Sequence, residues 1–307
     1  MIKTKVHKSK KIFVHRREDE NDSREMRTVP QRVAICIALV VFLIYAVTLI
    51  YPFFYIVMNA FKRTSEFTSN FNGLPQTWTF ENFISAIRYR TPTTRFSIPE
   101  MFLVSVMLSF GGTILTVLSS SMAAYTMAKY NFRGKEIIYS IVIFSLIVPI
   151  VGTLPATLQL LRTLGFYNTP VAVLFLSSGG FGMNFLLLYS FFKGLSWGYA
   201  EAAYIDGASD FQIFIRIMIP LAKGPLTAIA IITLIGLWND YTNPALFLPS
   251  MPSLAVGMQQ IIEDLTNKHE YPQIFASVII ALIPVLVIYI GFSKTIMVNT
   301  TVGGLKG

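Results

Sequence analysis

The chain has 307 residues, of which 53% are hydrophobic and only 13% are charged. This composition excludes an ordinary soluble globule, in which about a quarter of the residues are charged. The formal net charge is +9, but ten of the 25 Lys and Arg residues precede residue 33, so the basic excess does not indicate a nucleic-acid partner.

The first segment, residues 1–32, mixes basic and acidic residues and contains few apolar ones. Such a segment cannot bury enough surface to fold alone, so we expect a basic, disordered tail. The apolar run that follows starts too late and is too long for a cleaved signal peptide. The single cysteine, Cys36, lies in that run and excludes an intramolecular disulfide.

Uncharged stretches of about 18 or more residues predict membrane-spanning helices. At the most generous limits six such stretches occur, at residues 33–58, 101–127, 137–161, 171–192, 226–247 and 275–298, although the fifth contains Asp240 and the sixth contains Lys294 near its end. The predicted fold is therefore an all-α integral membrane protein, in which residues 33–307 form a six-helix transmembrane domain.

The distribution of Lys and Arg predicts how the chain is oriented. With the N-terminus inside, the inner segments contain 18 of these residues and the outer segments contain 7. Basic residues accumulate on the cytoplasmic side, so we expect a multi-pass protein of the cell membrane with both termini in the cytoplasm.

Several predicted spans contain small residues, glycine or proline. Three pairs of small residues in the second span are spaced four residues apart and should form a stripe for close helix packing. They are Ser105 and Ser109, Ser119 and Ala123, and Ser120 and Ala124. The third span contains Pro149 and Pro155, and the fourth contains three glycines between residues 179 and 182. Either feature indicates a kink, a close packing contact, or an interrupted helix that lines a cavity.

Two of the outward-facing loops in this topology are of some size, residues 59–100 and 248–273. The stretch LPQTWTFENFISAI in the first loop predicts a turn at Pro75, a helix cap at Thr79 and a short amphipathic helix. Either loop could receive an outer partner, although a simple connection is the default.

The inward loop at residues 194–223 is too long for a passive connection. It reads as two short helices, the first ending at Gly207 with Glu201 in its first turn, the second running from Asp210 into Pro220. Ala202, Ala203 and Gly207 predict a smooth knob that fits a partner's groove. Glu201 and Asp206 add directional charge, whereas a helix lying on lipid would favour Lys and Arg.

This loop resembles the signature of permease subunits of ATP-binding-cassette importers. The signature reads Glu-Ala-Ala, three residues, Gly, nine residues, Ile, one residue, Leu and Pro. It is matched here by Glu201, Ala202, Ala203, Gly207, Ile217 and Pro220, with Ile219 in place of Leu. The chain departs from the pattern at Ser196 and Gly198, and in the stretch MVNTTVGG near its end.

Further stretches resemble the carbohydrate branch related to the smaller permease of the maltose transporter. They are LPQTWTFENF, AAYTMAKYNFRGKE, LRTLGFYNTP, LWNDY, SLAVGMQ and the terminal GLKG. The resemblance covers roughly residues 51–307 and implies a type I importer permease that carries a sugar or oligosaccharide by alternating access.

The same resemblance implies a set of partners. The loop at 194–223 would carry a coupling helix seated in a cytoplasmic ATPase, with Glu201 meeting a basic residue there. The assembly would hold two ATPase subunits, a second homologous permease and an extracellular solute-binding protein. Because this sequence lacks a Gly-x-x-x-x-Gly-Lys-Ser/Thr motif, it should bind no cofactor, and ATP and Mg should act in the partner subunits.

Asn239, Asp240 and Tyr241 form the most polar patch within a predicted span. A charge at membrane depth is costly and is either functional or paired. Two interpretations stay open: a polar wall of the sugar path, or a structural pair with a neighbouring helix.

Three other function classes compete with an importer of sugars. A secondary transporter driven by an ion gradient needs intramembrane acids, and Asp240 is nearly the only one. An intramembrane enzyme needs a catalytic cluster, but His7, His15 and His269 all fall outside the spans. An importer permease for a non-sugar solute would share the loop at 194–223.

Overall fold

The computed structural model describes residues 29–148 and 152–302. Every regular element in these two ranges is a helix, apart from one isolated β-bridge between Arg90 and Ser97. The chain divides into two compact units, residues 1–56 and 57–307. Most of the predicted tail, up to residue 28, lies outside the described residues.

Helix α2, Val29–Ala60, makes up the described part of the first unit and continues into the second. Its 32 residues correspond to about 48 Å of helix, whereas the hydrocarbon core of a bilayer is about 30 Å thick. The first predicted span therefore falls on one uninterrupted helix.

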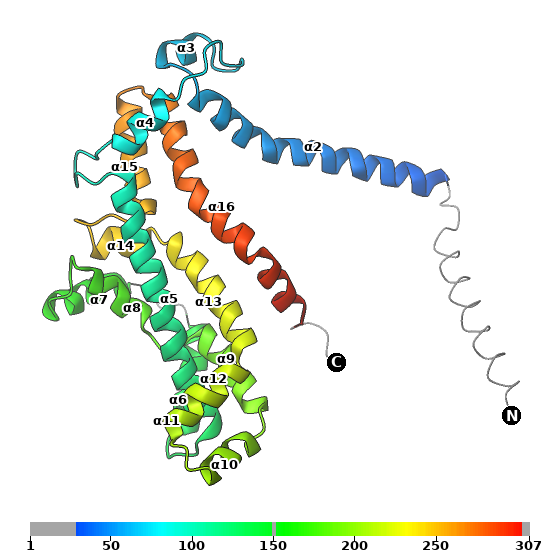
Figure 1. The fold of residues 1–307 in the computed structure, drawn as a ribbon, viewed down its shortest axis with the longest axis vertical. Coiled ribbons are helices and arrows are strands. Elements are labelled where there is room, and N and C mark those ends of the chain that lie inside the picture. The colour runs from blue at the N-terminus through cyan, green and yellow to red at the C-terminus, as the bar shows by residue number, and fades with distance from the viewer. Residues whose placement is uncertain (1–28, 149–151, 303–307) are drawn as a thin grey trace, which may run out of the picture. The chain divides into compact units, whose positions relative to one another are not determined.

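The second unit is organised around α5, Ile98–Lys129, which runs along its length with α13, Lys223–Trp238, packed against it (Figure 1). Helix α16, Tyr271–Val302, packs against α13. Helix α5 starts with a capping box between Ser97 and Glu100. The Glu100 carboxylate accepts a hydrogen bond from the Ser97 amide at 2.7 Å, and the Ser97 side chain pairs with the Glu100 amide. The small-residue stripe is confirmed in its buried members, which are Ser105, Ser109, Ser120 and Ala124.

Within the described ranges, three helical stretches are long and apolar enough to cross a membrane: Val33–Ala60, Ile98–Lys129 and Tyr271–Gly291. They coincide with the first, second and sixth predicted spans. The count rises to four if the bent pair Asp210–Leu221 and Lys223–Trp238 is taken as one span. The full count of six stays a prediction.

The other three predicted spans are each divided between two helices. The third falls on α6, Lys135–Ile147, and α7, Thr153–Thr163, and the fourth on α8, Pro170–Ser177, and α9, Met183–Gly194. The fifth falls on α13 and on α14, Thr242–Phe247.

The break between α8 and α9 has a packing reason. A Cβ atom added at Gly180 would lie 3.2 Å from the backbone oxygen of Ser119 in α5. The glycine therefore lets the broken segment approach the backbone of the central helix closely. This observation favours the interpretation as close packing.

The second unit has two distinct ends (Figure 1). The α4 end holds α3, Thr64–Ser69, α4, Glu81–Arg88, and α15, Leu254–Asn267. The α10 end holds α10, Gly198–Ile205, and the short helices that follow it.

Helix α4 is the amphipathic helix predicted after Thr79. The Thr79 hydroxyl accepts a hydrogen bond from the Glu81 amide at 3.2 Å, but the cap residue of α4 is Phe80, so the predicted cap lies one residue too early. A separate cluster of buried apolar side chains stabilises each end: Met101, Trp238 and Ile261 belong to the α4 end, and Phe192, Ile213 and Met218 to the α10 end.

Candidate functional site: the α10 end

The first predicted helix of the loop at 194–223 is α10, Gly198–Ile205. It begins three residues before Glu201, so this carboxylate lies in the first turn, where the amide groups present partial positive charge. The Glu201 amide donates to the Trp197 carbonyl at 3.1 Å. The sequence therefore predicted the helix correctly and placed its start slightly late.

Gly207 ends α10 in the predicted way. Its φ of +81° lies in the left-handed region, which a residue with a Cβ adopts only at a cost. The Gly207 amide donates to the Tyr204 carbonyl at 3.0 Å, and the Ala208 amide donates to the Ala203 carbonyl at 3.0 Å. These two bonds are those of a Schellman cap.

The exposed face of α10 differs in part from the predicted knob. Glu201, Ala202, Asp206 and Gly207 are exposed, but Ala203 is buried together with Ala200 and packs inward. Ala203 therefore contributes to the core of the α10 end and not to the exposed surface.

An apolar residue occupies the exposed face instead. Ile205, four residues after Glu201 and therefore on the same side of the helix, is 87% exposed. Isolated exposed apolar residues are common, but this one stands between two acidic groups, Glu201 and Asp206, at a helix tip. The surface that α10 presents is thus an isoleucine flanked by carboxylates.

The second predicted helix follows as three consecutive pieces: α11, Asp210–Ile213, the π-helical turn η1, Phe214–Met218, and α12, Ile219–Leu221. Ser209 caps it in a capping box with Gln212.

The sequence predicted that this helix stops at Pro220, but it continues to Leu221. The axis then bends by 81° before α13. Proline lacks the amide hydrogen that a regular α-helix requires. The π-helical turn immediately before Pro220 is one way for a helix to accommodate that loss.

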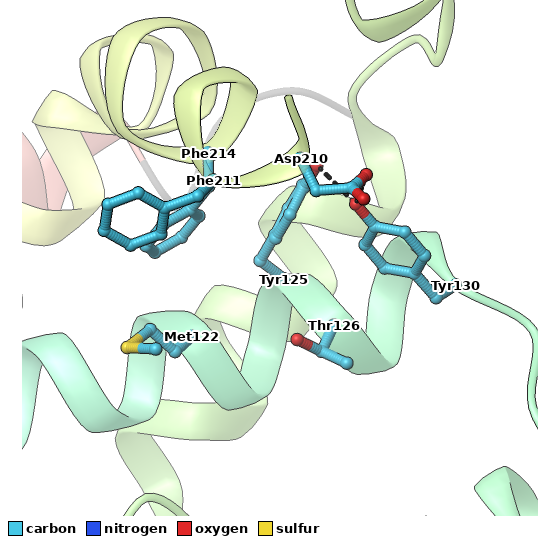
Figure 2. A pocket seen from close by; sticks show the side chains of 7 residues that line it. All are labelled: Met122, Tyr125, Thr126, Tyr130, Asp210, Phe211 and Phe214. Carbon is cyan, nitrogen blue, oxygen red and sulfur yellow. Dashed lines mark hydrogen bonds between the residues drawn. The ribbon is translucent and has the colours of Figure 1, made fainter. Parts of the chain in front are cut away.

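A hydrogen-bond network joins α10 and α11 to the end of α5. The Tyr130 hydroxyl, one residue beyond α5, donates to the Asp210 carboxylate at 2.7 Å, and the Tyr204 hydroxyl of α10 donates to the same oxygen. Figure 2 shows Tyr130 and Asp210 pointing toward each other.

The tyrosines respond electrostatically to this arrangement. The hydrogen bond to the Asp210 carboxylate raises the pKa of Tyr204, and burial together with the bonds to Tyr125 and Asp210 raises the pKa of Tyr130. Both phenols therefore remain hydrogen-bond donors at physiological pH.

A cavity of about 340 Å³ lies beside this network (Figure 2). Its lining is mainly aromatic and apolar, with Asp210 at one edge. The lining residues are Met122, Tyr125, Thr126, Tyr130, Asp210, Phe211 and Phe214.

The patch at Asn239, Asp240 and Tyr241 is located between α13 and α14. The Asp240 carboxylate accepts from the Asn243 amide at 3.2 Å and from the Asn243 side chain at 2.7 Å, so it caps the first turn of α14. Asn239 lines a second cavity of about 300 Å³ together with Trp238 and residues of α15 and α16. Asp240 is thus a local cap and Asn239 belongs to a cavity wall. Tyr241 is exposed.

Sequence reasoning missed Ile205, Lys129 and Tyr130. Ile205 could have been found from its four-residue spacing to Glu201. The other two belong to the quoted stretch AAYTMAKYNFRGKE, but no sequence signal relates them to a loop more than sixty residues away. Within the described residues no group of three or more His, Cys, Asp or Glu side chains could hold a metal ion.

Comparisons with known proteins agree with this arrangement. A family model described as "Binding-protein-dependent transport system inner membrane component" matches residues 116–294, which include the whole α10 end. The chain is 30% identical to the diacetylchitobiose uptake system permease protein NgcG of Streptomyces coelicolor, over 86% of each chain. It is 29% identical to the arabinooligosaccharides transport system permease protein AraQ of Bacillus subtilis, over 92% of this chain and all of AraQ.

The fold has a counterpart among solved structures. A chain of a bacterial ABC transporter involved in the import of the acidic polysaccharide alginate superposes with a TM-score of 0.72 at 22% identity, covering 88% of this chain and 98% of that one. The extent of the sequence matches, the apolar helices and the shared fold lead to one conclusion. The chain belongs to the binding-protein-dependent transport system inner membrane components, a family of membrane-embedded transporter permeases and not a family of enzymes.

Proposed function

We propose that this chain is a permease subunit of an ATP-driven importer that takes up a sugar or oligosaccharide. The names of its relatives support a carbohydrate, because NgcG is named for diacetylchitobiose and AraQ for arabino-oligosaccharides. They favour it over a non-sugar solute and over a secondary transporter driven by an ion gradient.

The observation that carries the mechanism is the exposed face of α10. We infer that α10 is the coupling helix, with Glu201, Ala202, Asp206 and Gly207 at the contact with the ATPase. An apolar side chain between two carboxylates fits a groove that has an apolar floor and basic rims. Ala203 and Pro220 support this surface without belonging to it. Ala203 is buried against the core beneath α10, and Pro220 lies just before the bend that leads into α13.

The remaining partners follow from an importer of this kind. A solute-binding protein delivers the sugar outside, a second homologous permease completes the pathway, and two ATPase subunits bind ATP and Mg. With both termini in the cytoplasm, α10 faces the ATPases. Their closure moves α10 and switches the helices between inward-open and outward-open arrangements.

We further infer that Asn239 lies on the translocation path, because it lines a cavity between α13, α15 and α16. Asp240 holds the first turn of α14 through Asn243. Tyr241, the residue preceding α14, is exposed and does not line that cavity, so its place on the path rests on its position next to this segment alone. In this arrangement Asn239 is the residue that presents a polar group to the solute.

The test uses the transporter purified with its partner subunits and reconstituted in liposomes. Uptake of a radiolabelled oligosaccharide mixture from chitin and arabinan is measured with and without MgATP. The variant Glu201→Lys should lose both ATPase co-purification and uptake. Glu263→Lys, an exposed acid of α15 at the α4 end, should retain both.

Two results would overturn the proposal. Normal uptake by Glu201→Lys would remove the coupling role of α10. Uptake that proceeds on an ion gradient without ATP would place the chain among secondary transporters.

A further inference from the structure

The α10 turn, which we define as residues 195–210, is held at both of its ends by two adjacent residues at the C-terminus of α5, namely its last residue and the cap residue that follows. Lys129 is the last residue of α5, and its ammonium group donates to the Leu195 carbonyl at 2.5 Å. Leu195 is the cap residue at the C-terminus of α9, where carbonyl groups lack helical partners and attract a cation. This bond fixes the point at which the chain enters the α10 turn.

The next residue, Tyr130, fixes the point of exit. Its hydroxyl donates to the Asp210 carboxylate at 2.7 Å, and Asp210 is the first residue of α11. Tyr204, from the last turn of α10, donates to the same carboxylate. The carboxylate therefore joins three elements: the end of α5, the end of α10 and the start of α11.

Ring contacts reinforce the same connection. The ring of Tyr130 packs edge-on against Trp197 at 6.0 Å between centroids, and Trp197 directly precedes α10. Tyr125, one turn earlier in α5, packs against Phe214 of η1 at 5.1 Å. Contacts from α5 thus reach the residues before and after α10.

Helix α5 connects this end of the unit with the other end. It is continuous from Ile98 to Lys129, and its buried side chains belong to both core clusters, Met101 at the α4 end and Tyr125 at the α10 end. A displacement of its last turn is therefore transmitted along one helix to the α4 end.

We propose that Lys129 and Tyr130 are positioning residues that fasten both ends of the α10 turn to α5, so that α10 and α5 move as one body when the partner ATPases close. This inference rests on the coupling role proposed above. It adds that force enters the membrane through the end of α5, in addition to the covalent route through α11 and α13.

The first test measures whether α10 and α5 move together. In a Cys36→Ser background, spin labels are attached at Tyr199→Cys, an exposed position of α10 outside the proposed ATPase contact, and at Ile114→Cys, an exposed position of α5. The distance is measured by electron paramagnetic resonance in the assembled transporter, without nucleotide and with MgATP and vanadate. We expect the same narrow distribution in both states. A shift of the distribution between the two states would overturn the inference.

The second test removes the two side-chain bonds. Tyr130→Phe keeps the ring contacts and loses the hydroxyl, and Lys129→Met keeps the length of the side chain and loses the charge. Each should broaden the distance distribution. Each should also lower the amount of oligosaccharide delivered per ATP hydrolysed by about tenfold or more, the scale of losing one charge-assisted hydrogen bond, while ATPase co-purification stays normal.

Matched controls lie at the same end of the unit. Tyr139→Phe keeps the ring contact with Tyr189, and Lys135→Met removes a cation at the start of α6. Both controls should transport like the unmodified chain. If Tyr130→Phe and Lys129→Met match the controls in both measurements, the positioning role is wrong.

One further measurement separates this inference from the proposed function. In the Cys36→Ser background, the variant Ala202→Cys should form a crosslink with the ATPase. Absence of the crosslink would count against the coupling role of α10 itself. A normal crosslink with unchanged coupling in both variants would count against the positioning residues alone.

Discussion

The Ser105 hydroxyl in α5 accepts a hydrogen bond from the backbone amide of Leu254, the first residue of α15, at 2.7 Å. Both residues are buried. The first amides of a helix have no partner within that helix. A side chain of α5 therefore completes the N-terminus of α15 and fixes its position at the α4 end.

Ser105→Ala should leave that buried amide without its partner. A buried unsatisfied donor costs about 1–3 kcal/mol, so we expect a lower melting temperature of the purified transporter in detergent. Ser121→Ala is the control, because Ser121 is also buried in α5 but donates to the Leu118 carbonyl of its own helix. Equal melting temperatures for the two variants would contradict this account.

Gly257 allows α15 to approach α5 closely. A Cβ atom at this position would lie 2.1 Å from the Met101 sulfur and 3.0 Å from its Cγ, and Met101 is fully buried. Gly257→Ala should therefore force a shift and cost about 1–3 kcal/mol of stability. Thermal unfolding measures the effect.

The control for that variant is Gly236→Ala in α13, where, among the described residues, no atom outside the local helix backbone lies within 4 Å of the added Cβ. Alanine has a higher helix propensity than glycine by about 1 kcal/mol, so this variant should be neutral or stabilised. An unchanged melting temperature in Gly257→Ala would show that Met101 moves aside at no cost.

The sequence predicted those features that depend on local patterns. The spans at 33–58, 101–127 and 275–298 are continuous apolar runs, and a run of that length has few alternatives to a long helix. The end of α10 at Gly207 was predictable for the same reason, because a left-handed cap depends on one glycine and its immediate neighbours.

The breaks in the other spans could not be assigned from the pattern. Glycines near residue 180 fit a continuous helix, a kink or a break, and the close approach to Ser119 decides between them in three dimensions. The Tyr130 to Asp210 bond joins residues 80 positions apart. The periodicity of a sequence does not indicate such a contact. Ala203 was predicted on the exposed surface but is buried, because the core against which a helix packs decides which of its faces is buried.

Gly207 should tolerate substitution according to the cost of its left-handed backbone. With φ at +81°, alanine costs about 1–2 kcal/mol, asparagine costs less because it visits this region more readily, and valine costs most. The order of ATPase affinity should therefore be Gly, Asn, Ala, Val, measured by titrating the purified ATPase onto the permease in nanodiscs.

Gly194→Ala is the control for this series, because an added Cβ at Gly194 meets no atom within 4 Å and its backbone is not left-handed. Its affinity should equal that of the unmodified chain. Equal affinities of the alanine and asparagine variants at Gly207 would show that backbone strain does not set the geometry of the site.

Ile205 should matter for assembly and not for the stability of the chain itself. Its side chain is 87% exposed, so Ile205→Ser removes almost no packing within the permease and should leave the melting temperature of the isolated subunit unchanged. If the side chain is buried in the ATPase groove, its loss costs about 1.5–3 kcal/mol of binding free energy, which corresponds to a weakening of about tenfold or more. Titration of the ATPase onto the permease measures it.

The matched control for Ile205 is Ile87→Ser on α4, an exposed isoleucine at the opposite end of the same unit. It should leave ATPase affinity unchanged, because the ATPase contacts only the α10 end in this arrangement. If Ile205→Ser binds the ATPase as tightly as Ile87→Ser does, the contact depends on the carboxylates alone. Glu201→Gln and Asp206→Asn should then weaken binding with a strong dependence on salt, since exposed charges are screened within about 10 Å at 0.1 M ionic strength.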